Sequence, residues 1–470
     1  MKRDVSLFLN GRVTSAEALV KNKTAHVLSS SNFWSVTENN SNNSWNVNFG
    51  SGNTNNNNKN NSNRGRAVSA LEEKELISWI EAADDCCRQK KTGRHCTEYR
   101  IREEVLVDLA LSVKERTYLP QTSECFVVKY PKLREIFAAH FLDRIVQHWI
   151  ILRIEPLLEE LFVSTGDVSF NCRKGYGTLR AVKTFHEGME RVSEGWTKDA
   201  WVGRFDLKSF FMSIDKGLLW TMLEKFIRER YHGEDKDTLL YLSEVTVKHR
   251  PQDNCVRKGD VSLWKNLPKD KSLFHMDGTP IGNITSQILA NFLLSPFDAW
   301  AYGFCMERGG CYVRFVDDIP VVLPKKEDVL LFRKEARKFL EGRIRQTLHP
   351  DKVYVQHVSK GVKFVGSVLK PCRIYLSNRT IGKMRSMLTG MESLCKRMYR
   401  SKRIRDGDLE ALEHYVCACN SYMGFLVHHA SYGVRRRMFG SMKYFWRCCY
   451  LSGRFSKVSI KRKFLNKSRL

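Results

Sequence analysis

The sequence predicts an α+β fold built around an antiparallel sheet, preceded by a disordered Asn-rich leader. Three observations predict this. Residues 200–375 alternate strand-like runs with helical segments. Residues 71–118 and the chain after residue 379 carry apolar side chains at helical spacing. About half of residues 32–63 are Asn, and this polar stretch cannot bury enough apolar surface to fold alone.

The predicted strands are short apolar runs separated by helices. They are VGRFDL (202–207), CYVRFVD (311–317), IPVVLP (319–324) and VKFVGSVLK (362–370). Before them, the run FVV at 126–128 indicates a further strand, and a helix is predicted through Phe137, Phe141, Ile145 and Trp149. The predicted domains are a leader, an N-terminal helical extension, a central α+β region and a basic helical end, at 1–69, 70–128, 129–375 and 376–470.

Composition indicates a nucleic-acid partner. The chain has 470 residues and a formal net charge of +27, from 78 Lys and Arg against 51 Asp and Glu. Such a balance favours a polyanion, and the alternative is a solvated basic surface without a partner. No apolar run reaches the roughly 18 residues of a bilayer span, and no signal peptide is recognisable, so a cytoplasmic protein without membrane contact is expected. The scattered cysteines form no paired CxxC units, so a zinc site is not expected.

Two acidic segments are candidates for metal binding. Asp317 and Asp318 lie between two apolar strand-like halves, where a hairpin turn would present them to a metal. Asp206 ends a separate apolar strand, and Phe211 follows five residues later. Carboxylates from two neighbouring strands are what a two-metal phosphoryl-transfer site needs, and hard oxygen ligands suit Mg²⁺. The plainer interpretation is a solvated Asp-Asp turn and an ordinary core Phe.

A third segment is a glycine-containing loop. Residues 278–287 read GTPIGNITSQ and precede the apolar helical run ILANFLLSPFD. Glycines allow close backbone approach to a ligand, and a helix is predicted after the turn. A loop that merely enters a core helix explains the glycines but not the order of the three segments.

In this order, the segments resemble motifs A, B and C of reverse transcriptases. Further matching blocks are REI to RIV (134–146), SFNCRKG (169–175), LHPDK (348–352) and FVG (364–366). The resemblance covers about residues 105–430, and the blocks are specific jointly rather than singly. It implies a right-hand polymerase with fingers, a palm that holds the antiparallel sheet and a helical basic thumb from residue 376. Motif C usually begins with Tyr, whereas Phe315 stands here.

The resemblance also implies site residues and ligands. Two Mg²⁺ ions would be held at Asp206, Leu207, Asp317 and Asp318, with Lys352 as the proton donor to pyrophosphate. Phe211 resembles the steric gate against a 2′-hydroxyl. Substrate contacts are implied for Arg173, Lys174, Phe211, Ile281, Gly282 and Gln287. Expected partners are template RNA, the RNA/DNA duplex and deoxynucleoside triphosphates. An exposed lysine is the plain alternative for Lys352.

Ile281 points to one type of reverse transcriptase. Most relatives carry Gln before the motif B glycine, and the pattern here is similar to that of diversity-generating retroelements. These copy a template-repeat RNA with errors mostly at adenines, and work with a small basic accessory oligomer. A translated template repeat is expected to be Asn-rich, because randomising the adenines of AAC and AAT never creates a stop codon. The leader fits that expectation, and a plain disordered leader is the alternative.

Two other functions stay open from the sequence. One is a faithful reverse transcriptase of the retron or group II intron type. The other is a non-catalytic RNA-binding protein that retains the fold. The presence of all three carboxylates favours an enzyme. The resemblance implies an RNA-directed DNA polymerase of bacterial or phage origin.

Overall fold

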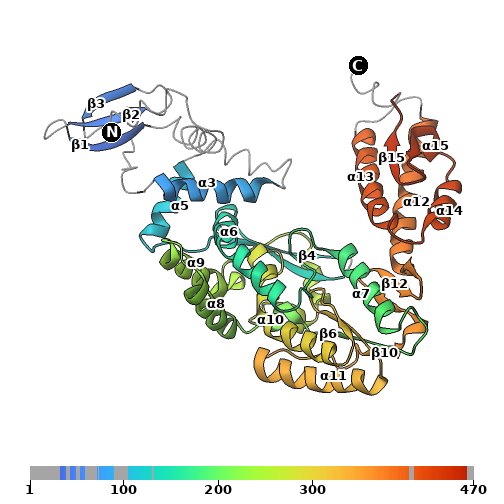
Figure 1. The fold of residues 1–470 in the computed structure, drawn as a ribbon. Coiled ribbons are helices and arrows are strands. Elements are labelled where there is room, and N and C mark those ends of the chain that lie inside the picture. The colour runs from blue at the N-terminus through green and yellow to red at the C-terminus, as the bar shows by residue number, and fades with distance from the viewer. Residues whose placement is uncertain are drawn as a thin grey trace, which may run out of the picture. The chain divides into compact units, whose positions relative to one another are not determined.

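The computed structural model describes residues 32–38, 43–48, 53–58, 71, 73–88, 104–129, 132–401 and 407–462. The chain divides into two compact units (Figure 1). Unit 1 takes in Met1–Leu161 and Ser209–Leu293, and unit 2 takes in Phe162–Lys208 and Leu294–Leu470. Among the described residues, no helix is long and apolar enough to cross a membrane.

Most of the predicted leader lies outside the described residues. Within it, the structure describes the backbone of three strands that pair antiparallel in the order β1-β2-β3. They are β1 (Asn32–Glu38), β2 (Asn43–Asn48) and β3 (Asn53–Asn58).

Unit 1 combines helices with a small three-stranded sheet of order β5-β4-β7, in which β4 pairs antiparallel with β5 and parallel with β7. Its elements are α3 (Glu73–Arg88), α5 (Glu104–Lys114), β4 (Ser123–Val128), β5 (Arg134–Ala138), α8 (Lys216–Arg230), α9 (Lys236–Lys248) and β7 (Cys255–Arg257). Short 3-10 turns are η2 (Phe210–Ser213), η3 (Pro251–Asp253), η4 (Val261–Asn266) and η5 (Lys269–Lys271). The helix predicted through Phe137 was wrong at that residue, because Phe137 pairs with Cys125 inside the β4–β5 hairpin and α6 begins only at Phe141.

Two long helices have residues in both units. They are α6 (Phe141–Ser164) and α10 (Ile284–Glu307). The predicted helix after the glycine-containing loop is therefore confirmed, with its first residue at Ile284.

The central sheet of unit 2 has the strand order β10-β6-β9-β8, with neighbouring strands antiparallel. Its strands and covering helices are α7 (Thr178–Val192), β6 (Trp201–Asp206), β8 (Cys311–Tyr312), β9 (Asp318–Leu323), α11 (Lys326–Phe339) and β10 (Tyr354–His357). Side chains alternate between the faces of a strand. Phe205 of β6 stacks on Phe332 of α11, whereas Val202 packs in a buried cluster with α7. The two helices therefore cover opposite faces (Figure 1), and Arg204 and Asp206 share the face of Val202.

Unit 2 also contains a separate antiparallel sheet, β11-β12-β13. Connecting and sheet elements are η6 (Leu340–Ile344), η7 (Val358–Lys360), β11 (Val362–Phe364), β12 (Ser367–Lys370) and β13 (Arg373–Leu376). The run VKFVGSVLK was predicted as one strand, but it folds into a hairpin. Val365 and Gly366 both have positive φ, of 41° and 84°, and this reverses the chain between β11 and β12.

The last described region is the C-terminal helical region, residues 378–462. It contains α12 (Asn378–Arg400), α13 (Asp408–Leu426), α14 (Tyr432–Gly440), α15 (Phe445–Cys448), β14 (Cys449–Ser452) and β15 (Lys457–Ile460). Met384, Met391, Cys395, Met423 and Phe439 are among the side chains that form its own buried core. The predicted helices are confirmed, whereas the β14–β15 hairpin was not predicted.

Candidate active site

Two acidic residues lie opposite each other on β6 and β9. The strand register pairs Asp206 with Asp318, and like charges in that position destabilise a sheet. Cations lie against both. Nε and Nη2 of Arg204 donate to the two carboxylate oxygens of Asp318, each at 2.7 Å, and the Lys352 ammonium donates to the Asp206 carboxylate. The Arg204–Asp318 contact is a diagonal pair on one sheet face, and both ion pairs offset the repulsion.

A tight turn connects Phe315 and Asp318, whose backbone groups exchange two hydrogen bonds of 3.0 Å. Val316, the first of the two residues between them, has a φ of 59°. This left-handed conformation costs a β-branched residue on the order of 1–3 kcal/mol, so the surroundings must impose it. The Val316 N–H donates to Oδ1 of Asn171 at 2.8 Å, and its carbonyl accepts from Nη1 of Arg314 at 3.1 Å. The predicted hairpin is thus present, and contacts on both sides hold it.

A buried ion pair anchors this turn to helix α10. Nε and Nη2 of Arg314 donate to the two carboxylate oxygens of Asp298 at 2.7 and 2.6 Å. The Tyr312 hydroxyl donates to the same carboxylate at 2.6 Å. The side chains of Arg314 and Asp298 are 0% and 1% exposed. Because both charged side chains are hydrogen-bonded, their burial is tolerated, and Arg314 holds the turn in place.

The loop after η6 is attached to the end of β6. The His349 N–H donates to the carbonyl of Asp206 at 2.8 Å. The Nδ1 atom of His349 accepts from the backbone amides of Asp351 and Lys352, at 3.2 and 3.3 Å. These bonds place Lys352 beside Asp206, so the structure brings together two of the catalytic residues that the sequence predicted.

Carboxylate oxygens are suitable ligands for Mg²⁺. A metal at Asp206 would have to displace the Lys352 ammonium from that carboxylate. The Leu207 N–H donates to the Asp317 carbonyl at 3.2 Å, which fixes Asp317 next to the end of β6. In the described part of the chain, no three Asp, Glu, His or Cys side chains converge as a metal-binding group. The Lys352 ammonium stands in as a cation on Asp206. Hard oxygens of Asp206 and Asp317 fit a metal once Lys352 moves away.

Asp318 differs from the other two carboxylates. It is 9% exposed, and burial raises its pKa to about 6, with a further rise from Asp317 and Asp206 that Arg204 opposes. Its carboxylate oxygens are both engaged by Arg204. In the structure Asp318 is thus paired with Arg204, and its predicted part in metal binding stays a prediction.

The two basic residues predicted to meet a triphosphate have different surroundings. The Arg173 side chain is 0% exposed and pairs with Asp167 at 2.9 Å. Its Nη1 donates to the Ser169 carbonyl at 2.7 Å, and its guanidinium lies 3.8 Å from the centroid of the Tyr176 ring. This arrangement does not present Arg173 to a phosphate. Lys174 is exposed and keeps its predicted role as a proposal.

The other predicted substrate residues belong to unit 1. The glycine-containing loop packs on η2, where the Thr279 N–H donates to the Phe211 carbonyl at 2.8 Å. A Cβ on Gly278 would lie 2.2 Å from that carbonyl oxygen, so only glycine permits the contact. The Ile281 carbonyl accepts from the Phe137 N–H at 3.0 Å. Ile281 and Gly282 thus lie in the loop that is hydrogen-bonded to Phe211. Gln287 lies exposed in the first turn of α10.

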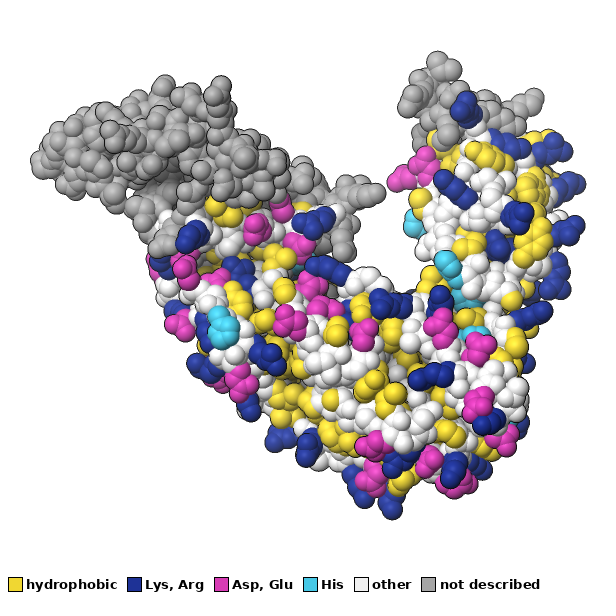
Figure 2. All heavy atoms as spheres, viewed as in Figure 1, with side chains coloured by type: hydrophobic (Ala, Val, Ile, Leu, Met, Phe, Trp, Pro, Cys, Tyr) yellow, Lys and Arg dark blue, Asp and Glu magenta, His cyan; other side chains and the backbone are white. Residues whose placement is uncertain are grey.

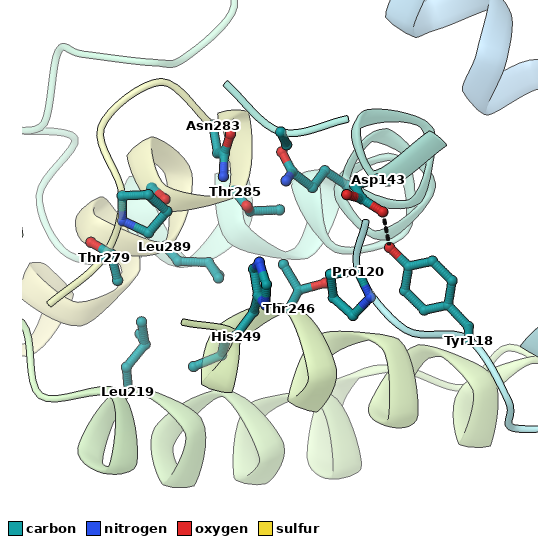
Figure 3. Close-up of a pocket in the computed structure, with 15 residues that line it drawn as sticks. Tyr118, Pro120, Asp143, Leu219, Thr246, His249, Thr279, Asn283, Thr285 and Leu289 are labelled. Carbon is teal, nitrogen blue, oxygen red and sulfur yellow. Dashed lines mark hydrogen bonds between the residues drawn. The ribbon is translucent and has the colours of Figure 1, made fainter. Parts of the chain in front are cut away.

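A small cavity of about 30 Å³ lies behind this loop. Residues that line it include Tyr118, Asp143, Leu219, His249, Thr279, Asn283 and Thr285 (Figure 3). The Tyr118 hydroxyl donates to Asp143 at 2.8 Å, and burial raises the pKa of Asp143 to about 6. This volume suits a water molecule and is far too small for a nucleotide. The cavity is therefore a small gap in the packing around the loop and not a nucleotide site.

Gly282 is expected to tolerate no side chain. Its φ is 127°, and a Cβ would lie 2.8 Å from the Phe137 carbonyl oxygen. We predict that Gly282→Ala destabilises the protein by roughly 1–3 kcal/mol, the cost of a strained backbone. Thermal unfolding measures this. Gly303→Ala, on α10 with open space around it, is the control and should stabilise by about 0.5–1 kcal/mol. Equal melting temperatures for the two variants would contradict the prediction.

Sequence reasoning missed Arg204 and Asp298. Arg204 lies two residues before Asp206, and the period of two along a strand places both on one face. Asp298 is an acidic residue inside an apolar helical run, and such a residue needs a buried partner. Its partner Arg314 could not be identified, because the contact joins distant parts of the chain.

Comparison with known proteins finds a matching family and one bacterial relative. The reverse transcriptase (RNA-dependent DNA polymerase) family matches residues 128–369, over half of the chain. Protein YkfC of Escherichia coli (strain K12) is 25% identical over 306 residues, which are 58% of this chain and 70% of YkfC.

Solved telomerase structures are also similar. Apo telomerase from Candida tropicalis, truncated from its C-terminal domain, has a TM-score of 0.39 and 13% identity, over 58% of this chain and 60% of that one. Telomerase from Candida albicans in complex with a TWJ fragment of telomeric RNA has a TM-score of 0.40 and 12% identity, over 73% and 61%. The chain thus spans about three fifths of those telomerase chains. By the family match, the chain belongs to the reverse transcriptase family of RNA-dependent DNA polymerases.

Proposed function

We propose that the chain copies a template-repeat RNA into cDNA with errors concentrated at template adenines, as the polymerase of a diversity-generating retroelement. Ile281, directly before Gly282, carries this proposal. Its backbone is fixed by the Phe137 N–H, and its half-buried side chain packs on the cluster around Phe137. An apolar side chain at this position offers no hydrogen bond to restrain a base pair, which lowers discrimination between bases.

The chemistry proposed for unit 2 is in-line phosphoryl transfer. Asp206 and Asp317 would hold two Mg²⁺, which when bound stabilise the attacking and leaving oxygens. The primer 3′-hydroxyl would give up its proton to solvent and attack the α-phosphorus, and the bond from that phosphorus to the pyrophosphate oxygen would break. Lys352, attached through His349 to the end of β6, donates a proton to the leaving pyrophosphate. Arg204 orients Asp318 beside these groups.

Roles in substrate binding are also proposed for the basic and loop residues that the sequence singled out. Lys174 would meet the triphosphate, and Arg173 would stabilise the segment before it through Asp167. Phe211, fixed by the Thr279 N–H to its carbonyl, would exclude a 2′-hydroxyl from the sugar position. Gly282 and Gln287 would lie along the templating base pair.

The remaining parts of the proposal concern partners. The template would be an RNA whose repeat encodes residues 32–63, and the basic C-terminal helical region would contact the RNA/DNA duplex. A small basic accessory oligomer is the expected protein partner. These partners are proposed from the resemblance and from the net charge of +27.

Ile281→Gln tests the error-prone part of the proposal. We expect it to lower misincorporation opposite template adenines by roughly fivefold to tenfold, the equivalent of about one hydrogen bond. The measurement is sequencing of cDNA made on one RNA template. Ile284→Gln, three residues further along, is the matched control and should leave the error spectrum unchanged. If wild type and Ile281→Gln copy adenines with the same error rate, Ile281 does not set fidelity.

A further inference from the structure

Tyrosines and basic residues gather at the far end of α12 and the start of α15. The Tyr399 and Tyr444 rings have centroids 6.0 Å apart. The Arg400 guanidinium and the Lys443 ammonium lie 5.6 and 6.0 Å from the Tyr444 ring centroid, and the Arg447 guanidinium lies 5.4 Å from that of Tyr399. We call these five residues the aromatic–basic patch.

The patch has a fixed backbone. The Glu392 carboxylate accepts hydrogen bonds of 2.8, 2.7 and 2.7 Å from the N–H groups of Lys443, Tyr444 and Phe445. Phe445 is 0% exposed in the core of the C-terminal helical region. The Glu392 carboxylate therefore fixes the backbone on the Tyr444 side of the patch. Preorganised rings lose little conformational entropy when they bind.

The charge around the patch favours an anionic partner. No acidic residue occurs in the sequence from Val434 to Leu470. On the face drawn in Figure 2, Lys and Arg side chains gather over the C-terminal helical region. Tyr399 nevertheless remains 48% exposed, and Arg400, Lys443 and Arg447 are exposed as well. Cations that lie on the exposed Tyr399 ring and on the half-buried Tyr444 ring match a chain of phosphates that carries unpaired aromatic bases.

From these contacts we propose that the aromatic–basic patch binds single-stranded RNA, with bases stacked on Tyr399 and Tyr444 and phosphates paired with the cations. A duplex hides the faces of its bases, so the rings select a single strand. The patch lies outside the carboxylate site. Tyr399 is near the end of α12, whose 23 residues span roughly 35 Å from the end next to β13. Since none of its five residues belongs to the carboxylate site, we assign the patch to RNA other than the base pair being formed.

The test uses the full chain with its duplex-binding surface first saturated by an RNA/DNA template–primer. Binding of a fluorescent, unstructured oligouridine is then followed by anisotropy at several salt concentrations. Tyr399→Ala with Tyr444→Ala should weaken binding roughly tenfold or more, because each stacked base is lost. Tyr399→Phe with Tyr444→Phe keeps the rings and should bind close to wild type. Tyr432→Ala removes another exposed tyrosine of the same region and should have no effect.

The basic residues have their own readout. Arg400→Gln with Arg447→Gln should lower the slope of log affinity against log salt by about 1.4, since each lost phosphate contact to a single strand removes about 0.7. If the double Ala variant binds oligouridine as tightly as Tyr432→Ala does, the inference is overturned. The patch would then be a surface for contact with a protein. Equal competition by duplex RNA would also overturn it. Both outcomes are independent of whether the carboxylate site makes DNA.

Discussion

Asp317→Asn and Asp206→Asn are each expected to lower the rate of RNA-templated DNA synthesis by roughly a thousandfold or more, the equivalent of about 4 kcal/mol of transition-state stabilisation. The amide keeps the size of the side chain but removes the negative charge that would hold the metal. Asp206 lies at the end of β6, and the Asp317 carbonyl is bonded to the adjacent Leu207 N–H, so both carboxylates lie where the two strands meet. Primer extension on an RNA template measures the effect.

The control for this prediction lies at the other end of the same strand. Asp199 precedes β6, is 90% exposed at its side chain, and pairs with His357 at 3.2 Å. Asp199→Asn should leave synthesis at the wild-type rate. Synthesis by Asp317→Asn at a rate close to that of Asp199→Asn would show that the turn between β8 and β9 does not carry the chemistry.

The second large effect is expected at the buried ion pair. Asp298→Ala should destabilise the protein by about 3–5 kcal/mol, because the Arg314 guanidinium stays buried without its partner. The Tyr312 hydroxyl loses its acceptor at the same time. Arg314 also bonds the Val316 carbonyl, so the turn that carries Asp317 should lose its fixed conformation. Thermal unfolding and primer extension are both expected to reveal the loss.

Two further variants distinguish the effect of the buried ion pair on stability from its effect on DNA synthesis. Glu335→Gln removes an exposed ion pair with Lys338 and should change stability by less than about 1 kcal/mol. Asp298→Leu combined with Arg314→Met replaces the buried charges by apolar side chains and should recover stability. It should not recover DNA synthesis, because the Val316 turn lacks its arginine. Full stability of Asp298→Ala would contradict the account of the pair.

The sequence predicted the parts of the site that depend on local pattern. The apolar runs around Asp206 and Asp317 became β6 and the β8–β9 hairpin, because alternation and a turn are local properties. The sequence did not predict that Arg204 would neutralise Asp318, since the pairing depends on strand register. Nor did it predict the burial of Arg173, which depends on the ring of Tyr176 and the carboxylate of Asp167.

Two elements of the fold were also not predicted from the local sequence pattern. Phe137 fits a helical spacing with later apolar residues, yet pairing with Cys125 draws it into a strand. The β14–β15 hairpin was not predicted, because its short strands follow a basic stretch without strong alternation. In the first case strand pairing overrides the local helical spacing, and in the second the local pattern is too weak to indicate the strands.

The most direct test of the account is the sequence of the cDNA that the purified chain makes. The reaction would contain Mg²⁺, deoxynucleoside triphosphates, the accessory oligomer and an RNA whose repeat encodes residues 32–63. We predict cDNA with substitutions concentrated opposite template adenines. Faithful cDNA would contradict the proposed retroelement type and leave a reverse transcriptase of another kind. No cDNA at all would contradict the proposed chemistry of Asp206 and Asp317.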